Sequence, residues 1–448
     1  MSDRVARAGP PRPPPLPTWP LPTGPLPTWP LPTWPLPTWP LIAMFGLVPL
    51  WWLLGGFYLG WPVFGALLLG LLVARGRVAV PPGTLCWLLF MALVVLSATQ
   101  IDRATAYLTF GLKVGFLLTA LVVAVYVYNL GREGVGIDTL LRPVALFWLG
   151  LVALGWLGVL HPTFSMVTAL ESLVPGTLAG DRFVQDLVHA QANEFNAGSS
   201  RPIYRTAAPY AHTNNWGTAY ALLLPCVLAY FTAARRGALR TTVLVSLPLS
   251  VVPAFFTLNR GMFLGLGAGL LYLAVRSLIR GRGRLFGGIV AVGGLFYAIS
   301  LVVPVRDLIN TRVETTNTNV DRLDLYVRTW QEVLRSPLLG HGVPNSVDTS
   351  LAAEPLGTQG MLWHVMYSYG IPALLAFLCW LVLAAWRLRS GTSPAAQWLS
   401  VVPVIALVVI PVYGYLDPNL SILFLAVGAA LATLPAAQPR PTLVRVAA

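Results

Sequence analysis

The chain consists mostly of long apolar runs that are separated by short polar segments. Twelve of these runs have roughly the length that an α-helix needs to cross a lipid bilayer. They cover approximately residues 41–57, 60–74, 84–100, 105–128, 143–161, 213–233, 239–257, 262–279, 286–304, 361–386, 395–415 and 418–435. The pattern predicts an all-α, polytopic integral membrane protein of about twelve transmembrane helices, with its transmembrane domain at 41–435.

The basic residues divide unevenly between the segments that join these runs. If alternate segments are cytoplasmic, 18 of the 29 Lys and Arg residues lie inside, ten lie outside, and Lys113 lies within a span. Short cytoplasmic loops of bacterial membrane proteins are enriched in Lys and Arg. We therefore predict a bacterial cytoplasmic (inner) membrane protein with both termini in the cytoplasm, including a C-terminal tail at 436–448.

The first forty residues differ from the rest of the chain. A unit Pro-Leu-Pro-Thr-Trp repeats from Pro15 to Trp39, with Gly24 replacing Trp once. Proline at this density prevents helix and favours the extended polyproline II conformation. We predict a disordered, cytoplasmic, Pro-rich tail at 1–40. It is either a ligand for a proline-binding partner or a repeat-expanded tail whose tryptophans lie at the lipid interface.

Composition excludes several other classes of function. With 56% hydrophobic and 10% charged residues, the chain does not have the balance of a soluble domain. Much of the net charge of +13 lies in loops that set orientation, so we expect no nucleic-acid partner. The cysteines Cys86, Cys226 and Cys379 lie inside apolar runs without metal-ligand spacing. We expect neither a metal site nor a cofactor.

Two predicted outer loops are long, at about 162–211 and 305–360. Arg205 and Arg322 lie in these loops, and Arg260 lies in a very short outer loop. Because short outer loops are normally poor in Lys and Arg, arginines beside apolar spans there indicate an anionic ligand at the outer edge of the membrane.

The first candidate group ends the loop at 162–211. Arg205 is followed by His212, Asn214 and Asn215 at the start of a predicted span. The free N–H groups and the positive dipole end of a helix attract anions there. Ordinary helix capping is the alternative for the asparagines, but it leaves Arg205 unexplained.

The second group is the sequence Thr257-Leu-Asn-Arg260-Gly261, which we predict to be a tight outer turn between two spans. Arg260 binds a ligand there or extends to lipid headgroups. Lys113 has the same two interpretations, because a charge inside a span is costly and is a functional candidate by default.

The third group begins with a predicted amphipathic helix on the outer membrane surface. Apolar residues recur at helical spacing from Leu323 to Leu334, opposite a charged face. Arg322 borders the apolar stripe near the helix start. The helix is expected to end at Pro337, and a Gly-His341-Gly turn follows that allows close approach to a ligand.

The order and sidedness of these three groups resemble the bacterial O-antigen ligase and O-antigen polymerase family. The resemblance covers roughly residues 200–380 and rests on short motifs: Arg205 before Asn214-Asn215, Thr257-x-x-Arg260-Gly261, and Arg322 before Ser336-Pro-Leu-Leu-Gly-His341-Gly. It implies a GT-C-like, metal-independent membrane glycosyltransferase. Such an enzyme moves glycan from an undecaprenyl-diphosphate carrier to an acceptor glycan or glycolipid at the outer face of the membrane.

The resemblance also implies roles for single residues. Arg205 and Arg260 match the arginines that hold the carrier diphosphate, and Arg322 matches a further basic residue of the large loop. The family pattern has a His-Asn pair where this chain has Gln359, and glutamine cannot accept a proton. We expect His341, or else His364, to replace the missing base. Alternatively, the chain is an inactive homologue, or a transporter or flippase for lipid-linked oligosaccharide.

The orientation leads to the first prediction. Single cysteines introduced as Ser199→Cys and Ser346→Cys should react with an impermeant maleimide in intact cells or spheroplasts, because both lie in predicted outer loops. Gly281→Cys should not react. The reverse labelling pattern would contradict both the topology and an active site on the outer face.

Overall fold

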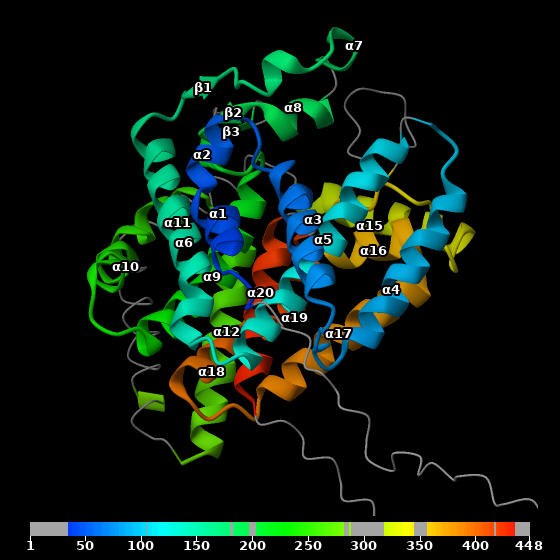
Figure 1. Cartoon of the computed structure of the whole chain (residues 1–448). Coiled ribbons are helices and arrows are strands. Elements are labelled where there is room, and N and C mark those ends of the chain that lie inside the picture. Colours follow the sequence, from blue (N-terminus) through cyan, green and yellow to red (C-terminus); the bar gives the residue numbers. More distant parts are fainter. Residues whose placement is uncertain are drawn as a thin grey trace, which may run out of the picture. The chain divides into compact units, whose positions relative to one another are not determined.

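The computed structural model describes residues 35–104, 106–179, 182–196, 203–281, 286–287, 318–344, 356–415 and 418–434. The described chain is mostly helical (Figure 1). Residues 1–34 of the tail predicted at 1–40 lie outside the described residues, as do the tail at 436–448 and nearly all of the expected span at 286–304. Residues 35–40 are described, and α1 begins at Trp39, so the ordered chain starts before the predicted end of the tail.

The helices follow one another along the whole described chain. Their bounds are α1 (Trp39–Gly46), α2 (Val48–Leu53), α3 (Gly60–Arg75), α4 (Thr84–Ser97), η1 (Ala98–Gln100), α5 (Ala106–Arg132), α6 (Ile137–Leu160), η2 (Glu171–Leu173), α7 (Gly176–Ala179), α8 (Arg182–Val188), α9 (Thr213–Ala233), α10 (Ala238–Leu249), α11 (Val251–Phe256), α12 (Arg260–Ile279), α15 (Thr318–Arg335), α16 (Met361–Tyr369), α17 (Ile371–Leu388), α18 (Pro394–Leu399), α19 (Val402–Val409) and α20 (Pro418–Thr433).

Among the described residues, five helices are long and apolar enough to cross a membrane, namely α5, α6, α9, α12 and α17. Five further apolar segments are shorter, at Gly60–Arg75, Thr84–Gln100, Ala238–Leu249, Pro394–Val409 and Pro418–Thr433. These helices are consistent with a helical membrane protein, whereas the number of twelve spans stays a prediction.

Several predicted spans are interrupted rather than continuous. The run at 41–57 divides into α1 and α2, the run at 239–257 into α10 and α11, and the run at 395–415 into α18 and α19. Proline lies in the first turn of α2, α17 and α19, where its missing N–H and fixed φ allow a helix to begin but not to continue from the preceding turn. Hydropathy alone does not register these breaks.

The run at 361–386 divides at Gly370, between α16 and α17. Gly370 has φ of 88° and ψ of 170°, a conformation that is open essentially to glycine only. A Cβ at this position would also overlap the carbonyl group of Leu338. The chain therefore changes direction here and holds the segment after α15 against the α16–α17 junction.

Helix α20 lies at the centre of the packed helices (Figure 1, red) and packs most extensively against α5. Fourteen of its residues are buried. Gly428 approaches the backbone of Ala124 so closely that a Cβ would overlap it. The rings of Trp380 and Phe424 stack with centroids 4.0 Å apart. A close backbone approach at a glycine, as is common between helices in membranes, and stacked aromatic rings thus contribute to the packing of α20.

Contacts at one end of the helices join segments that the arginine pattern assigns to the inner side. Arg75 forms an ion pair with Glu133, and the Asn129 side chain hydrogen-bonds both the N–H and the carbonyl of Ala79 at 2.8 Å. Arg276 of α12 donates to the Arg389 carbonyl at 2.9 Å. These segments do share one end of the fold, although which end faces the cytoplasm stays a prediction.

The predicted outer loop at 162–211 contains ordered structure. Strand β1 (Ser165–Met166) pairs with β2 (Ala190–Gln191), and β3 (Asn193–Asn196) pairs with β4 (Ile203–Thr206), both antiparallel. Helices α7 and α8 lie between β1 and β2 in sequence. Within the described residues, these two small sheets are the only departure from the predicted all-α class.

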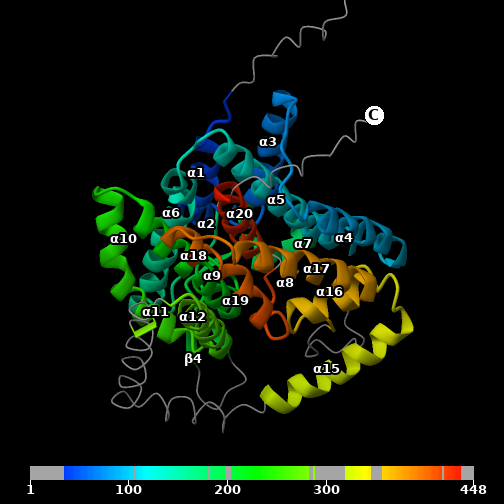
Figure 2. The ribbon, with the colours of Figure 1, turned by 90° about the horizontal axis from the view of Figure 1, so that it is seen from below.

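Helix α15 confirms the predicted amphipathic helix, and it lies beside α16 (Figure 2, yellow). Val333 is fully buried, and the ring of Tyr326 stacks on Trp363 with centroids 4.7 Å apart. Leu323, Val327 and other apolar side chains of a second stripe stay exposed. That stripe suits a membrane surface, and the surface position itself stays a prediction.

The α16–α17 junction leads to a prediction about stability. Gly370→Ala should lower the free energy of unfolding by about 1–3 kcal/mol, because alanine at this φ and ψ is strained and its Cβ meets backbone. Gly267→Ala in α12 is the matched control, since nothing lies within 4 Å of its Cβ position. Thermal unfolding of the purified protein measures both. Equal midpoints would contradict this account of the junction.

Candidate functional site

The starts of four helices meet at the end of the fold that is predicted to face outward. The Asn259 side chain, before α12, donates to the Asn214 carbonyl of α9 at 3.3 Å. Asn419 of α20 donates to the Asn215 carbonyl at 2.9 Å. Tyr413 joins the start of α12 to that of α16, because its hydroxyl accepts from Gly261 N at 3.2 Å and its carbonyl accepts from Met361 N at 3.0 Å. Four positive dipole ends thus gather there.

Arg205 lies in β4 and is buried, with 7% of the residue exposed. Its Nε donates to the Thr257 carbonyl at 3.0 Å, and its Nη1 lies 3.9 Å from Glu194 Oε2. Glu194 faces Arg205 across the β3–β4 ladder. The Arg205 guanidinium therefore holds the turn before α12 through the Thr257 carbonyl. The first two candidate groups predicted from the sequence do come together, and Arg205 connects them.

His212 lies between two carboxylates that the sequence analysis did not select. Its Nε2 is 3.5 Å from Asp186 Oδ2, and its Nδ1 is 3.5 Å from Glu194 Oε1. The hydrogen bonds to Asp186 and then Glu194 raise the pKa of His212 to about 10, although burial opposes the shift. His212 is therefore a cation at neutral pH.

Glu194 also caps the start of α9. Its Oε2 accepts from Thr213 N at 2.9 Å. Burial works to raise the pKa of Glu194, but the hydrogen bond with His212 and the charge of Arg205 outweigh it and lower the pKa to about 2. Capping by the asparagine side chains, the alternative interpretation from the sequence, is not what the structure shows, since His212 occupies the N-cap position without a side-chain cap bond. The cap comes from a carboxylate 19 residues earlier in the chain.

The turn at 257–261 has the tight geometry that the sequence predicts. The Asn259 side chain accepts from Met262 N at 2.9 Å and caps α12. A Cβ at Gly261 would overlap the ring of Tyr413, so glycine is required by close packing. Arg260, the first residue of α12, is exposed. In the part of the chain that the structure describes, no hydrogen bond or ion pair engages its side chain.

The remaining candidates lie around α16. Lys113 Nζ is 3.5 Å from Nε2 of His364, which is 7% exposed. Gln359 is half-buried and precedes α16.

His341 lies against the other end of α16. Its ring centroid is 4.6 Å from that of Tyr367, and its Nε2 is 3.2 Å from the Glu332 carbonyl. Arg322 is in α15, and its side chain lies outside the described residues. The candidates therefore form two groups: Arg205, His212, Asn214, Asn215 and Arg260 around the starts of α9 and α12, and Lys113, His364, Gln359 and His341 around α16.

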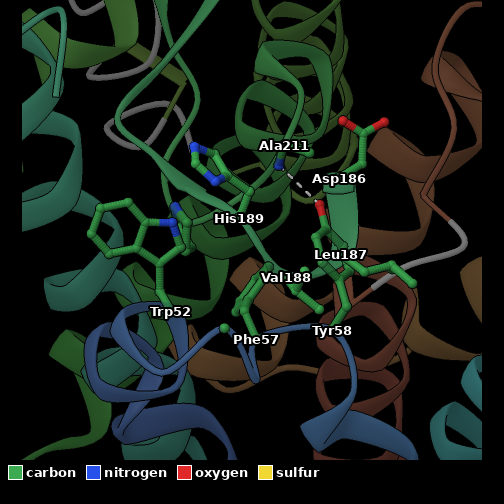
Figure 3. Close-up of a pocket in the computed structure, with 10 residues that line it drawn as sticks. Trp52, Phe57, Tyr58, Asp186, Leu187, Val188, His189 and Ala211 are labelled. Carbon is green, nitrogen blue, oxygen red and sulfur yellow. Dashed lines mark hydrogen bonds between the residues drawn. The ribbon is translucent and has the colours of Figure 1, made fainter. Parts of the chain in front are cut away.

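A small recess in the predicted outer loop at 162–211 lies beside the first group (Figure 3). It is lined by residues of the α2–α3 connection, by Asp186 to His189, and by Pro209 and Ala211. Tyr58 accepts a hydrogen bond from Ala211 N at 3.1 Å. Figure 3 shows His189 and Trp52 on one side of the recess and Asp186 on the other. Three residues of the site were not identified from the sequence, namely Asp186, Glu194 and Tyr413. No sequence motif marks them, because only contacts between distant segments bring them to the site.

Comparison of the sequence with models of known protein families and with curated proteins finds no match.

The His212 cluster leads to a prediction about pH. Because the folded-state pKa of His212 lies above its ordinary value of 6.5, its contribution to stability is complete below pH 6.5 and is lost as the pH rises toward about 10. The thermal midpoint of the purified wild-type protein should fall over this pH range. The midpoint of His212→Gln should fall by a smaller amount. The exposed His161→Gln is the control and should keep the wild-type profile. Superimposable profiles for wild type and His212→Gln would contradict the assignment.

Proposed function

We propose that the protein transfers glycan from an undecaprenyl-diphosphate carrier to a glycan or lipid-linked acceptor at the outer face of the bacterial cytoplasmic membrane. In this proposal it is a twelve-span, GT-C-like enzyme of the polysaccharide polymerase or O-antigen ligase type. The observation that carries the proposal is Arg260, an exposed cation without a partner in the described chain, at the place where four helix starts meet.

The charges around Arg260 support an anionic ligand. Arg205 and charged His212 balance Glu194 and Asp186, so this inner group is close to neutral. Arg260 then adds an uncompensated positive charge beside the helix dipoles. A lipid diphosphate suits such a place, because its headgroup stays at the membrane edge while its chain lies in the bilayer.

The same arrangement suits the chemistry of glycan transfer. Negative charge grows on the diphosphate as the glycosidic bond breaks, and a fixed arginine stabilises that charge more in the transition state than in the ground state. Arg205 acts here as a positioning residue, because its guanidinium holds the Thr257 carbonyl and so holds the turn. Arg260 is the residue that contacts the diphosphate.

The acceptor hydroxyl needs a proton acceptor, and the placement of the histidines favours His364 over His341. Met361 begins α16 and is hydrogen-bonded to Tyr413. His341 contacts Tyr367, which lies about 9 Å further along α16. His364 lies in the first turn of α16 and so is nearer to those contacts.

The test measures binding of undecaprenyl diphosphate to the purified full-length protein by the shift of its thermal midpoint. Wild type should be stabilised, and Arg260→Ala should bind at least about tenfold more weakly because a charge-assisted contact is lost. Arg260→Lys should restore binding only in part, since a point charge lacks the bidentate fork. Arg236→Ala, an exposed arginine of the predicted inner side, is the matched control.

Glycan transfer in cells adds a second readout. Arg260→Ala should abolish polymer formation while the protein still inserts, and His364→Ala should lose more activity than His341→Ala. Unchanged carrier binding and normal polymer in Arg260→Ala would show that this arginine only contacts lipid headgroups.

A further inference from the structure

A second group of reactive side chains lies in the outer loop, apart from the proposed carrier site. Ser165 Oγ is 2.7 Å from His189 Nε2, and His189 Nδ1 is 2.8 Å from Glu171 Oε2. A hydroxyl, an imidazole and a carboxylate therefore form one chain of hydrogen bonds. The carboxylate accepts from Nδ1–H, so Nε2 has the lone pair that accepts the serine proton.

Exposure increases along this chain from the acid to the alcohol. The Glu171 side chain is 14% exposed and the His189 side chain 26%, while Ser165 is an exposed residue. An activated nucleophile needs this order, because the serine must meet a substrate while the acid stays fixed.

The acid is held by contacts of its own. Thr168 N donates to Glu171 Oε2 at 3.3 Å, and Glu171 N donates to Thr168 Oγ1 at 3.1 Å. Thr168 Oγ1 also donates to the Val188 carbonyl at 2.7 Å, next to His189. The segment that carries the acid is thus tied to the segment that carries the base.

The backbone at Ser165 offers one donor for a developing oxyanion. Ala192 N donates to the Phe164 carbonyl at 2.9 Å, so Ser165 and Gln191 form a non-hydrogen-bonded pair of the β1–β2 ladder. The Ser165 N–H therefore points to the open edge of β1, which pairs with β2 alone among the described strands. A donor there can stabilise a tetrahedral intermediate.

His189 also lines the recess drawn in Figure 3, together with Trp52 and Phe57. The recess is small and its lining does not include Ser165. A substrate therefore reaches the exposed Ser165 from the open surface, where a short acyl chain is easier to accommodate than a long one.

We propose that Ser165, His189 and Glu171 form a nucleophilic triad that hydrolyses short-chain carboxylic esters. Ser165 Oγ attacks the ester carbonyl carbon while its proton passes to His189 Nε2. The ester C–O bond breaks, and the alkoxide leaves as an alcohol with that proton. Water then attacks the acyl-serine, gives a proton through His189 back to Ser165 Oγ, and releases the carboxylic acid. Ester and water are thus converted to alcohol and acid.

The experiment uses the purified full-length protein in lipid nanodiscs with a fluorophosphonate probe, and peptide mass spectrometry to locate the adduct. We expect an adduct on Ser165 of wild type and hydrolysis of p-nitrophenyl acetate. Turnover should fall to background in Ser165→Ala and by about 100-fold in His189→Gln. Ser172→Ala removes an exposed serine of the same loop and should behave as wild type.

The wild-type labelling needs no substitution, so a folding defect in a variant does not obscure the result. Ser165→Ala alters an exposed side chain, and its thermal midpoint reports whether the loop keeps its fold. If wild type forms no adduct on Ser165, or if Ser165→Ala hydrolyses the ester as fast as wild type, the three residues only join β1 to β2 and the proposal is wrong. Either result is independent of carrier binding at Arg260.

Discussion

The carboxylate of Glu194 is the interaction on which the predicted outer end of the protein depends. It caps α9 through Thr213 N, pairs with His212 and faces Arg205 across the ladder. Hydrogen bonds to a charged group contribute about 1.5–3 kcal/mol each. Loss of this carboxylate would also remove the ion pair of the buried Arg205 with Glu194, whose atoms lie 3.9 Å apart. Through Arg205 the effect reaches Thr257 and the turn that presents Arg260.

The sequence predicts the membrane class and the positions of most apolar helices, because hydropathy over about twenty residues is a strong local signal. It does not predict where the spans break. Pro49 and Pro403 begin new helices, and Gly370 turns the chain between α16 and α17, yet each lies in an otherwise continuous apolar run. Breaks of this kind depend on tertiary partners that satisfy the freed backbone groups. Composition alone does not identify those partners.

The candidate site was predictable in part. The turn at Arg260 and the polar stretch from Arg205 to Asn215 were both visible from the sequence, and the structure brings them together. Asp186 and Glu194 were missed, because an acid in a polar outer loop is ordinary until a buried arginine or a helix start is placed beside it. The same holds for Ser165, Glu171 and His189, which are separated in sequence and meet only because β1 pairs with β2.

The hydrogen bonds at the helix starts also limit what can hold an anion there. Thr213 N is taken by Glu194, Gly261 N by Tyr413, Met262 N by Asn259, and Met361 N by the Tyr413 carbonyl. These amides are therefore not available to cradle a phosphate in the manner of a glycine-rich loop. The helix dipoles still contribute a positive field, but directional contacts must come from side chains. That requirement gives Arg260 its importance, since it is the exposed cation at this junction that the surrounding acids do not neutralise.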